Sequence, residues 1–166
     1  MARVAHLASR FVGSLWPGGP AAADEAWATH HLGAGEVALW RRMKGFDRRH
    51  AVGVAQRVSS ALGVEAARPV MAAALLHDVG KVDSNLGVFA RVVATVRAAV
   101  LGAERAASGS GRMARYTNHP WIGAQLLSDA GADALTVTWA AEHHLPITAW
   151  TVPEEVGTVL KDADDD

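Results

Sequence analysis

The stretch Met71-Ala72-Ala73-Ala74-Leu75-Leu76-His77-Asp78-Val79-Gly80-Lys81 decides the fold. Its first six residues are apolar and rich in alanine, the best helix former, so they predict a buried helix. This helix delivers His77 and Asp78 at its C-terminal end, and the chain then turns away around Gly80. Adjacent residues on a helix differ by about 100° in direction, so one pocket at the helix end can receive both side chains. An imidazole beside a carboxylate is a candidate metal-binding pair, but it carries weight only together with further ligands.

Apolar periods, with glycine and proline breaks, predict helices along the rest of the chain. Val54, Val58 and Leu62 recur at four-residue steps and stop at Gly63, which predicts a helix over residues 47–62. No run of alternating β-branched and polar residues is long enough to predict a strand. The fold class is therefore predicted to be all-α. The other expected helices cover residues 2–15, 21–30, 36–43, 66–78, 85–101, 118–130, 134–144 and 153–166.

Four further side chains are predicted to cap a helix or to pack in the core. Asn118 is expected to cap the helix that follows it. Asp47 is also expected to be an N-cap, and the alternative is that it orients the imidazole of His50 one turn later. Trp139 and Trp121 are expected to pack in the core rather than to wall a pocket or to stack on a base.

The length of 166 residues fits one domain, and 50% hydrophobic residues suffice for a packed core. This composition excludes a wholly disordered chain. Residues 1–44 are expected to form an N-terminal helical extension packed on the core. Residues 45–166 are expected to form the core unit, so that the whole chain is one compact body.

Charge and cysteine usage exclude several classes of protein. Sixteen Lys and Arg against seventeen Asp and Glu argue against a protein that mainly coats nucleic acid. The chain has no cysteine, which excludes a disulfide scaffold, a thiolate metal site and a cysteine nucleophile. Any metal must therefore be held by nitrogen and oxygen. No apolar stretch approaches the length of a membrane span, and the cytoplasm is the expected compartment.

Histidines supply the candidate ligands. Imidazole and carboxylate are the ligands for zinc, iron and manganese when thiolate is absent. One ion needs three or four such groups, and two ions that share a bridging carboxylate need about seven. Five histidines fall at expected helix ends or on helix faces, beside Asp78 and the aspartates of the tail: His50, His77, His119, His143 and His144.

The segment from Leu75 to Lys81 resembles the HD superfamily of metal-dependent phosphohydrolases. That family has a histidine, then an HD pair, then a distant aspartate, all on helices. The matching positions here are His50, the His77-Asp78 pair and Asp164, which follows Ala163; Asp162 is the alternative for the last ligand. The resemblance covers roughly residues 45–166. It implies an HD-domain helical bundle, here with additional N-terminal helices.

Two further segments are similar to the HD-GYP phosphodiesterases within that superfamily. The segment around His119 (residues 118–127) resembles their third-histidine segment, and Glu142-His143-His144 resembles their histidine pair. Residues 145–150 stand where the GYP segment would lie, so the resemblance does not extend to cyclic di-GMP as substrate. That subgroup carries two metals. The resemblance implies that His50, His77, Asp78 and Asp164 hold one ion, and that Asp78 bridges to a second ion held by His119, His143 and His144.

The resemblance also implies a reaction. It implies hydrolysis of a phosphodiester or nucleotide by a metal-bound hydroxide at a dinuclear centre, with Asp78 and Lys81 as catalytic residues. Iron or manganese is expected, with zinc, nickel, cobalt or magnesium as alternatives. Lys81 is expected to face the substrate phosphate rather than only to complement the helix dipole. Arg48 and Arg49 form either a phosphate-binding rim or a solvated helix face. The expected partner is a small phosphate ester or nucleotide, without strong nucleic-acid binding and without a membrane.

Other functions stay open at this point. A one-metal nucleotidase would need only one of the two ligand sets. A nucleotide-sensing module would keep the fold and the ligands without turnover. Related two-iron HD-type centres occur in oxygenases, which share the architecture but not the reaction.

Overall fold

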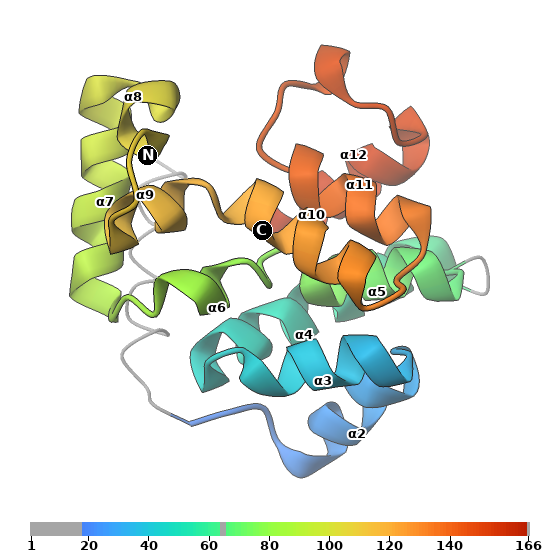
Figure 1. Cartoon of the computed structure of the whole chain (residues 1–166). Helices are drawn as coiled ribbons and strands as arrows, with labels where there is room; N and C mark the ends of the chain where they lie inside the picture. Colours follow the sequence, from blue (N-terminus) through green and yellow to red (C-terminus); the bar gives the residue numbers. More distant parts are fainter. Residues whose placement is uncertain (1–17, 64–65, 166) are drawn as a thin grey trace.

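The computed structural model describes residues 18–63 and 66–165, which fold as a bundle of α-helices (Figure 1). The all-α prediction is confirmed, because these residues contain no strand. The expected helix over residues 2–15 lies outside the described residues. The helices are α2 (Ala22–His30), α3 (Ala34–Arg42), α4 (Gly45–Leu62), α5 (Arg68–Leu76), α6 (Lys81–Ser84), α7 (Val88–Leu101), α8 (Ala103–Ala107), α9 (Arg112–Thr117), α10 (His119–Asp129), α11 (Ala134–Glu142) and α12 (Glu154–Asp165), with a short 3-10 turn at Ile147–Ala149.

Helix α5 lies at the centre of the core. Every residue from 70 to 76 is buried, as the apolar composition of this segment predicts. The helix packs against α4, α11 and α12 (Figure 1). Since α5 is surrounded by other helices, its C-terminal end points into the middle of the protein rather than to its surface.

The helices before α4 join the same core. Ala28 of α2 and Trp40 of α3 have no exposed surface and belong to the hydrophobic cluster built around α5. The indole Nε1 of Trp40 donates a hydrogen bond of 2.8 Å to Glu25, which ties α3 to α2. Residues 22–43 are thus packed on the rest of the bundle.

Both expected helix caps are corrected. Helix α4 begins at Gly45, so Asp47 lies inside its first turn, where its carboxylate accepts bonds of 2.6 and 2.9 Å from the guanidinium of Arg91. Asn118 stands at the N-cap position of α10, but its side chain makes no capping bond and donates instead to the carbonyl of Ala107. In both cases a partner from a distant helix takes the polar group.

The segment between α5 and α10 differs most from expectation. The helix expected over residues 85–101 begins only at Val88, and residues 103–117 form the additional helices α8 and α9. The apolar stripe of α7 faces outward, with Val93, Val96 and Val100 at 54%, 56% and 77% exposure. Its inward face carries Ala94 and the ion-paired Arg91 instead.

Among the described residues, no single helix has both the length and the apolar character to cross a membrane. The bent pair Arg68–Ser84 and Phe89–Leu101 meets the criteria of length and composition alone.

Candidate metal centre

The turn after α5 places the HD pair. Helix α5 ends at Leu76, and residues 77–80 form a turn that leads into α6. His77 and Asp78 are 2% and 4% exposed, so both polar side chains lie inside the protein. A Cβ on Gly80 would lie 2.6 Å from the backbone nitrogen of Gly123 and would overlap the carbonyl oxygen of His119. Only glycine therefore allows this turn to approach the start of α10, where His119 lies.

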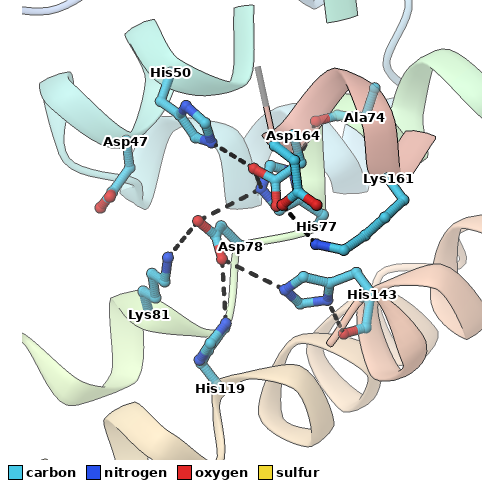
Figure 2. A network of polar contacts seen from close by, with 12 residues as sticks. Asp47, His50, Ala74, His77, Asp78, Lys81, His119, His143, Lys161 and Asp164 are labelled. Carbon is cyan, nitrogen blue, oxygen red and sulfur yellow. Dashed lines mark hydrogen bonds and ion pairs between the residues drawn. The ribbon is translucent and has the colours of Figure 1, made fainter. Parts of the chain in front are cut away.

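Two groups of candidate ligands meet at this turn and share Asp78 (Figure 2). Within each group, one ligand atom from every residue lies within 4.8 Å of the others. The first group consists of His50, His77 and Asp78, and the second group consists of Asp78, His119, His143 and His144. The segments that supply them are α4, the turn after α5, α10 and the end of α11.

The two oxygens of Asp78 face different groups. Oδ1 lies 3.1 Å from Nε2 of His119 and 3.7 Å from Nε2 of His143. Oδ2 lies 3.5 Å from Nε2 of His77. This is the arrangement that a carboxylate needs if it is to bridge two cations, with one oxygen directed to each.

Asp164 borders the first group. Its Oδ1 lies 2.9 Å from Nε2 of His50 and 3.6 Å from Nε2 of His77 (Figure 2). It is 7% exposed, and it comes from the last turn of α12. Asp162 is exposed on the same helix. Of the two aspartates considered for this position, Asp164 is the one beside the histidines.

The second group is closed by a pair of consecutive histidines at the end of α11. The ring centroids of His143 and His144 are 4.0 Å apart, and the ring of His144 lies 5.1 Å from that of His119. His119 and His143 are buried, whereas His144 is exposed. The second group therefore reaches the surface at His144.

Backbone carbonyls select the tautomer of three imidazoles. Nδ1 of His77, His119 and His143 lies 2.8–2.9 Å from the carbonyl oxygen three residues earlier. A carbonyl can only accept, so each Nδ1 carries the proton and donates it. The remaining Nε2 of each ring is buried and has no hydrogen bond with proper geometry among the described residues. Metal-binding histidines are oriented in this way, by a bond from the nitrogen that does not bind the metal.

The surroundings of Asp78 favour an ionised carboxylate and, at His119 and His143, neutral imidazoles. Burial raises the pKa of Asp78, but the positive charges of Lys81 and His77 outweigh burial and hold the pKa well below its usual value. Burial lowers the pKa of His119 to about 4 and also lowers the pKa of His143. Neutral Nε2 atoms thus direct lone pairs at a carboxylate oxygen, which is unfavourable without a cation between them. The donor set fits a divalent ion in the second group.

In the first group, neighbouring carboxylates raise the proton affinity of an imidazole. Burial lowers the pKa of His77, but the charges of Asp78 and Asp164 outweigh burial and raise the pKa above its ordinary value. Burial raises the pKa of Asp164, whereas His77 and the bond with His50 lower it, and the lowering dominates. Two carboxylates around two imidazoles make this group strongly attractive to positive charge.

The predicted substrate-binding cations lie in different surroundings. The ammonium of Lys81 makes an ion pair with Oδ2 of Asp78 inside the centre (Figure 2). Arg48 binds Glu25 of α2 at 2.7 Å. Arg49 is partly buried on α4, next to His50. Lys81 thus contacts the shared carboxylate of the centre, whereas Arg48 is paired with a glutamate of α2.

The two tryptophans near the histidines behave differently. Trp139 is 2% exposed in the core, with its ring 6.4 Å from that of His143. The core prediction for Trp121 is wrong, because it is 72% exposed. Trp121 lies two residues after the buried His119 on α10, which turns it away from the inward face.

Two residues that support the centre, Arg91 and Glu142, were given no such role in the sequence analysis. Arg91 holds Asp47 one turn before His50, and its guanidinium carbon also lies 5.6 Å from the ring centroid of Tyr116. Glu142 accepts bonds of 2.7 and 2.6 Å from the backbone and hydroxyl of Thr151, so it fixes the loop that follows the histidine pair. No local pattern marks these contacts, because Arg91 and Asp47 are 44 positions apart and the contacts of Glu142 with Thr151 cross a loop without a regular period.

Comparisons with known proteins identify no relative of this chain. No protein-family model, curated protein or solved structure matches the chain. The functional interpretation therefore depends on the geometry of the centre.

Proposed function

We propose that the protein is a metal-dependent phosphohydrolase with a dinuclear centre. The observation that carries the proposal is the single buried carboxylate, Asp78, with a separate set of imidazoles directed at each of its oxygens. A structural metal site needs one ion and a closed set of ligands. Here two sets share a ligand, and one of them reaches the surface at the exposed His144.

The ligands distribute between two ions. His50, His77, Oδ2 of Asp78 and Asp164 would hold the first ion. Oδ1 of Asp78 and the three other imidazoles, those of His119, His143 and His144, would hold the second. Nitrogen and oxygen donors of this kind suit iron or manganese, and also zinc, nickel and cobalt.

The ions would supply Lewis acidity and a water of lowered pKa, as divalent metals do in other two-metal hydrolases. The residues of the chain prepare the site for that chemistry. Carbonyl bonds at Nδ1 hold the rings of His77, His119 and His143 in one orientation. The burial of Asp78 keeps bulk water away from the shared carboxylate and strengthens electrostatic attraction there.

Lys81 is the chain's own cation at the centre. Its side chain is 13% exposed, and the attraction of Asp78 outweighs burial to raise the pKa of Lys81, so the ammonium is charged at neutral pH. An ammonium beside two ion sites suits a phosphate oxygen of the substrate. We therefore propose a phosphodiester or a nucleotide as substrate.

Hydrolysis can be tested with the full chain loaded with Mn²⁺ or Fe²⁺. The probes are a para-nitrophenyl phosphodiester and, in parallel, a nucleoside monophosphate. Turnover is expected with metal, and it should disappear with a chelator and in Asp78→Ala. Release of phosphate only from the monophosphate, with one ion per chain, would favour a nucleotidase instead.

Two aspartates of α12 give a matched pair of variants. Asp164→Asn should lose turnover together with the first ion, because Asp164 contacts His50 and His77. Asp162→Asn should retain turnover, because Asp162 is exposed on the same helix. Tight nucleotide binding by the metal-loaded protein without any hydrolysis would contradict the proposal and indicate a sensing module.

A further inference from the structure

The ion pair of Lys81 involves an oxygen that a metal ion also needs. Lys81 is the first residue of α6, and its Nζ binds Oδ2 of Asp78 (Figure 2). The same oxygen faces Nε2 of His77 in the first group. Oδ1, which serves the second group, has His119 and His143 as its neighbours. The contact of Lys81 is therefore specific to one of the two groups.

An ammonium and a divalent cation at one oxygen repel each other strongly. Like charges a few ångströms apart in a buried site interact with several kcal/mol, even with substantial screening. Asp78 is 4% exposed, so little water is present to weaken that repulsion. Binding of an ion to the first group thus requires the ammonium of Lys81 to leave Oδ2.

An aromatic ring lies beside the ammonium in its present position. Nζ of Lys81 lies 5.9 Å from the ring centroid of Tyr116, within the range of a cation–π contact. Tyr116 is only partly buried on α9. A phosphate group at the centre would provide a stronger partner than this ring, because it is an anion.

We propose that Lys81 competes with the first metal ion for Oδ2 of Asp78, and that phosphate relieves this competition by giving Lys81 a different partner. The inference rests on the proposed function, since it assigns a regulation to the same centre. A metal ion in the first group and a phosphate at the centre should then each strengthen the binding of the other. By thermodynamic linkage each ligand then raises the affinity for the other by the same factor.

The experiment is a Mn²⁺ titration of the full chain by calorimetry. Variants His50→Ala and His144→Ala, which each remove a ligand of one group only, assign the two binding steps. In Lys81→Met the affinity of the first group should rise about tenfold, within the usual range of coupling between ligands. The affinity of the second group should stay the same. Lys81→Gln provides a second test if the methionine variant does not fold.

Lys161→Met is the matched control. Lys161 lies one turn before Asp164 on α12, but its Nζ binds Asp165 at 2.7 Å rather than Asp78. Its removal takes away one positive charge near the first group without freeing Oδ2, so Mn²⁺ affinity should hardly change. An equal gain in both lysine variants would show a general charge effect and overturn the proposal.

Inorganic phosphate completes the test. It should tighten Mn²⁺ binding to the first group in the wild type and have no such effect in Lys81→Met. Unchanged or weaker Mn²⁺ binding in both Lys81 variants would refute the competition. If the competition is observed but no ester is hydrolysed, the proposed function fails alone. If the wild type binds no Mn²⁺, both proposals fail.

Discussion

Nε2 of His50 lies 2.9 Å from Oδ1 of Asp164, although the two residues are 114 positions apart in the chain. The contact joins α4 to the last turn of α12, and it closes the first group of ligands beside His77. Helix α12 thus contributes a ligand to the centre.

Metal stoichiometry should follow the two groups. The wild type should bind two ions per chain, His144→Ala and His50→Ala one each, and Asp78→Ala none, since Asp78 belongs to both groups. Elemental analysis of purified protein measures this directly. Two ions retained in Asp78→Ala would show that the carboxylate is not shared.

The stability of the chelator-treated protein should be greatest near pH 6.5. The pKa of His119 is lowered to about 4, so the unfolded chain binds a proton there that the folded chain does not, and stability rises with pH up to 6.5. His143 acts in the same direction. The pKa of His77 is raised in the folded protein. The contribution of His77 to the free energy of unfolding is therefore complete below pH 6.5, and it is lost as the pH rises through the pKa that His77 has in the folded state.

Thermal melting between pH 4 and pH 8 checks this profile. His119→Asn should flatten the rise of stability between pH 4 and pH 6.5, where the titration of this buried imidazole changes the free energy of unfolding by up to about 1.4 kcal/mol per pH unit. His77→Asn should flatten the alkaline side. A stability that rises steadily through pH 8 would contradict the assignment for His77.

Gly80→Ala should be strongly destabilising. The new methyl group would overlap the backbone of His119 and Gly123, and neither backbone can move without displacing α10. We expect a loss of about 3 kcal/mol in unfolding free energy, together with weaker metal binding to the second group. The measurement is denaturant unfolding.

Gly87→Ala is the control for that variant. A Cβ on Gly87 would meet nothing within 4 Å, and the residue stands just before α7. Gly87 is the N-cap of α7, where glycine is preferred over alanine, so its replacement should cost no more than about 1 kcal/mol. Equal effects of the two substitutions would show that the close approach at Gly80 is unimportant.

Arg91→Met should leave the carboxylate of Asp47 buried without its guanidinium. Loss of one partner from a buried pair costs about 3–5 kcal/mol, whereas removal of both is far less harmful. The double variant with Asp47→Leu should therefore be more stable than Arg91→Met alone. A double-mutant cycle from denaturant unfolding measures the coupling, and additive effects would argue against the pair.

The outward face of α7 should tolerate charge. Val96 is 56% exposed, so Val96→Lys should change unfolding free energy by no more than about 0.5 kcal/mol. Ala94 is 1% exposed on the inward face, and Ala94→Lys should unfold the helix from the bundle. Comparable stability of the two variants in thermal melts would mean that α7 faces the other way.

The sequence alone was sufficient to predict the all-α class, the buried helix before His77, and the candidate ligands. These depend on local rules: alanine and leucine favour helix, glycine ends it, and imidazole and carboxylate are chemically suited to metals. The same rules misplaced Asp47 and Asn118 as caps, because tertiary packing brings the guanidinium of Arg91 to Asp47 and the carbonyl of Ala107 to Asn118. They also misplaced Trp121, which is exposed. The helical period shows which side chains share a face of a helix, but it does not show whether another helix covers that face.

Only the tertiary structure decided which oxygen of Asp78 faces which histidines, and that Lys81 shares one of those oxygens. It also decided that Asp164 rather than Asp162 lies beside His50. The physical reason is that a contact between two helices depends on their packing angle and depth, which the whole core sets. Residue type specifies what a side chain can bind, whereas packing specifies what lies within its reach.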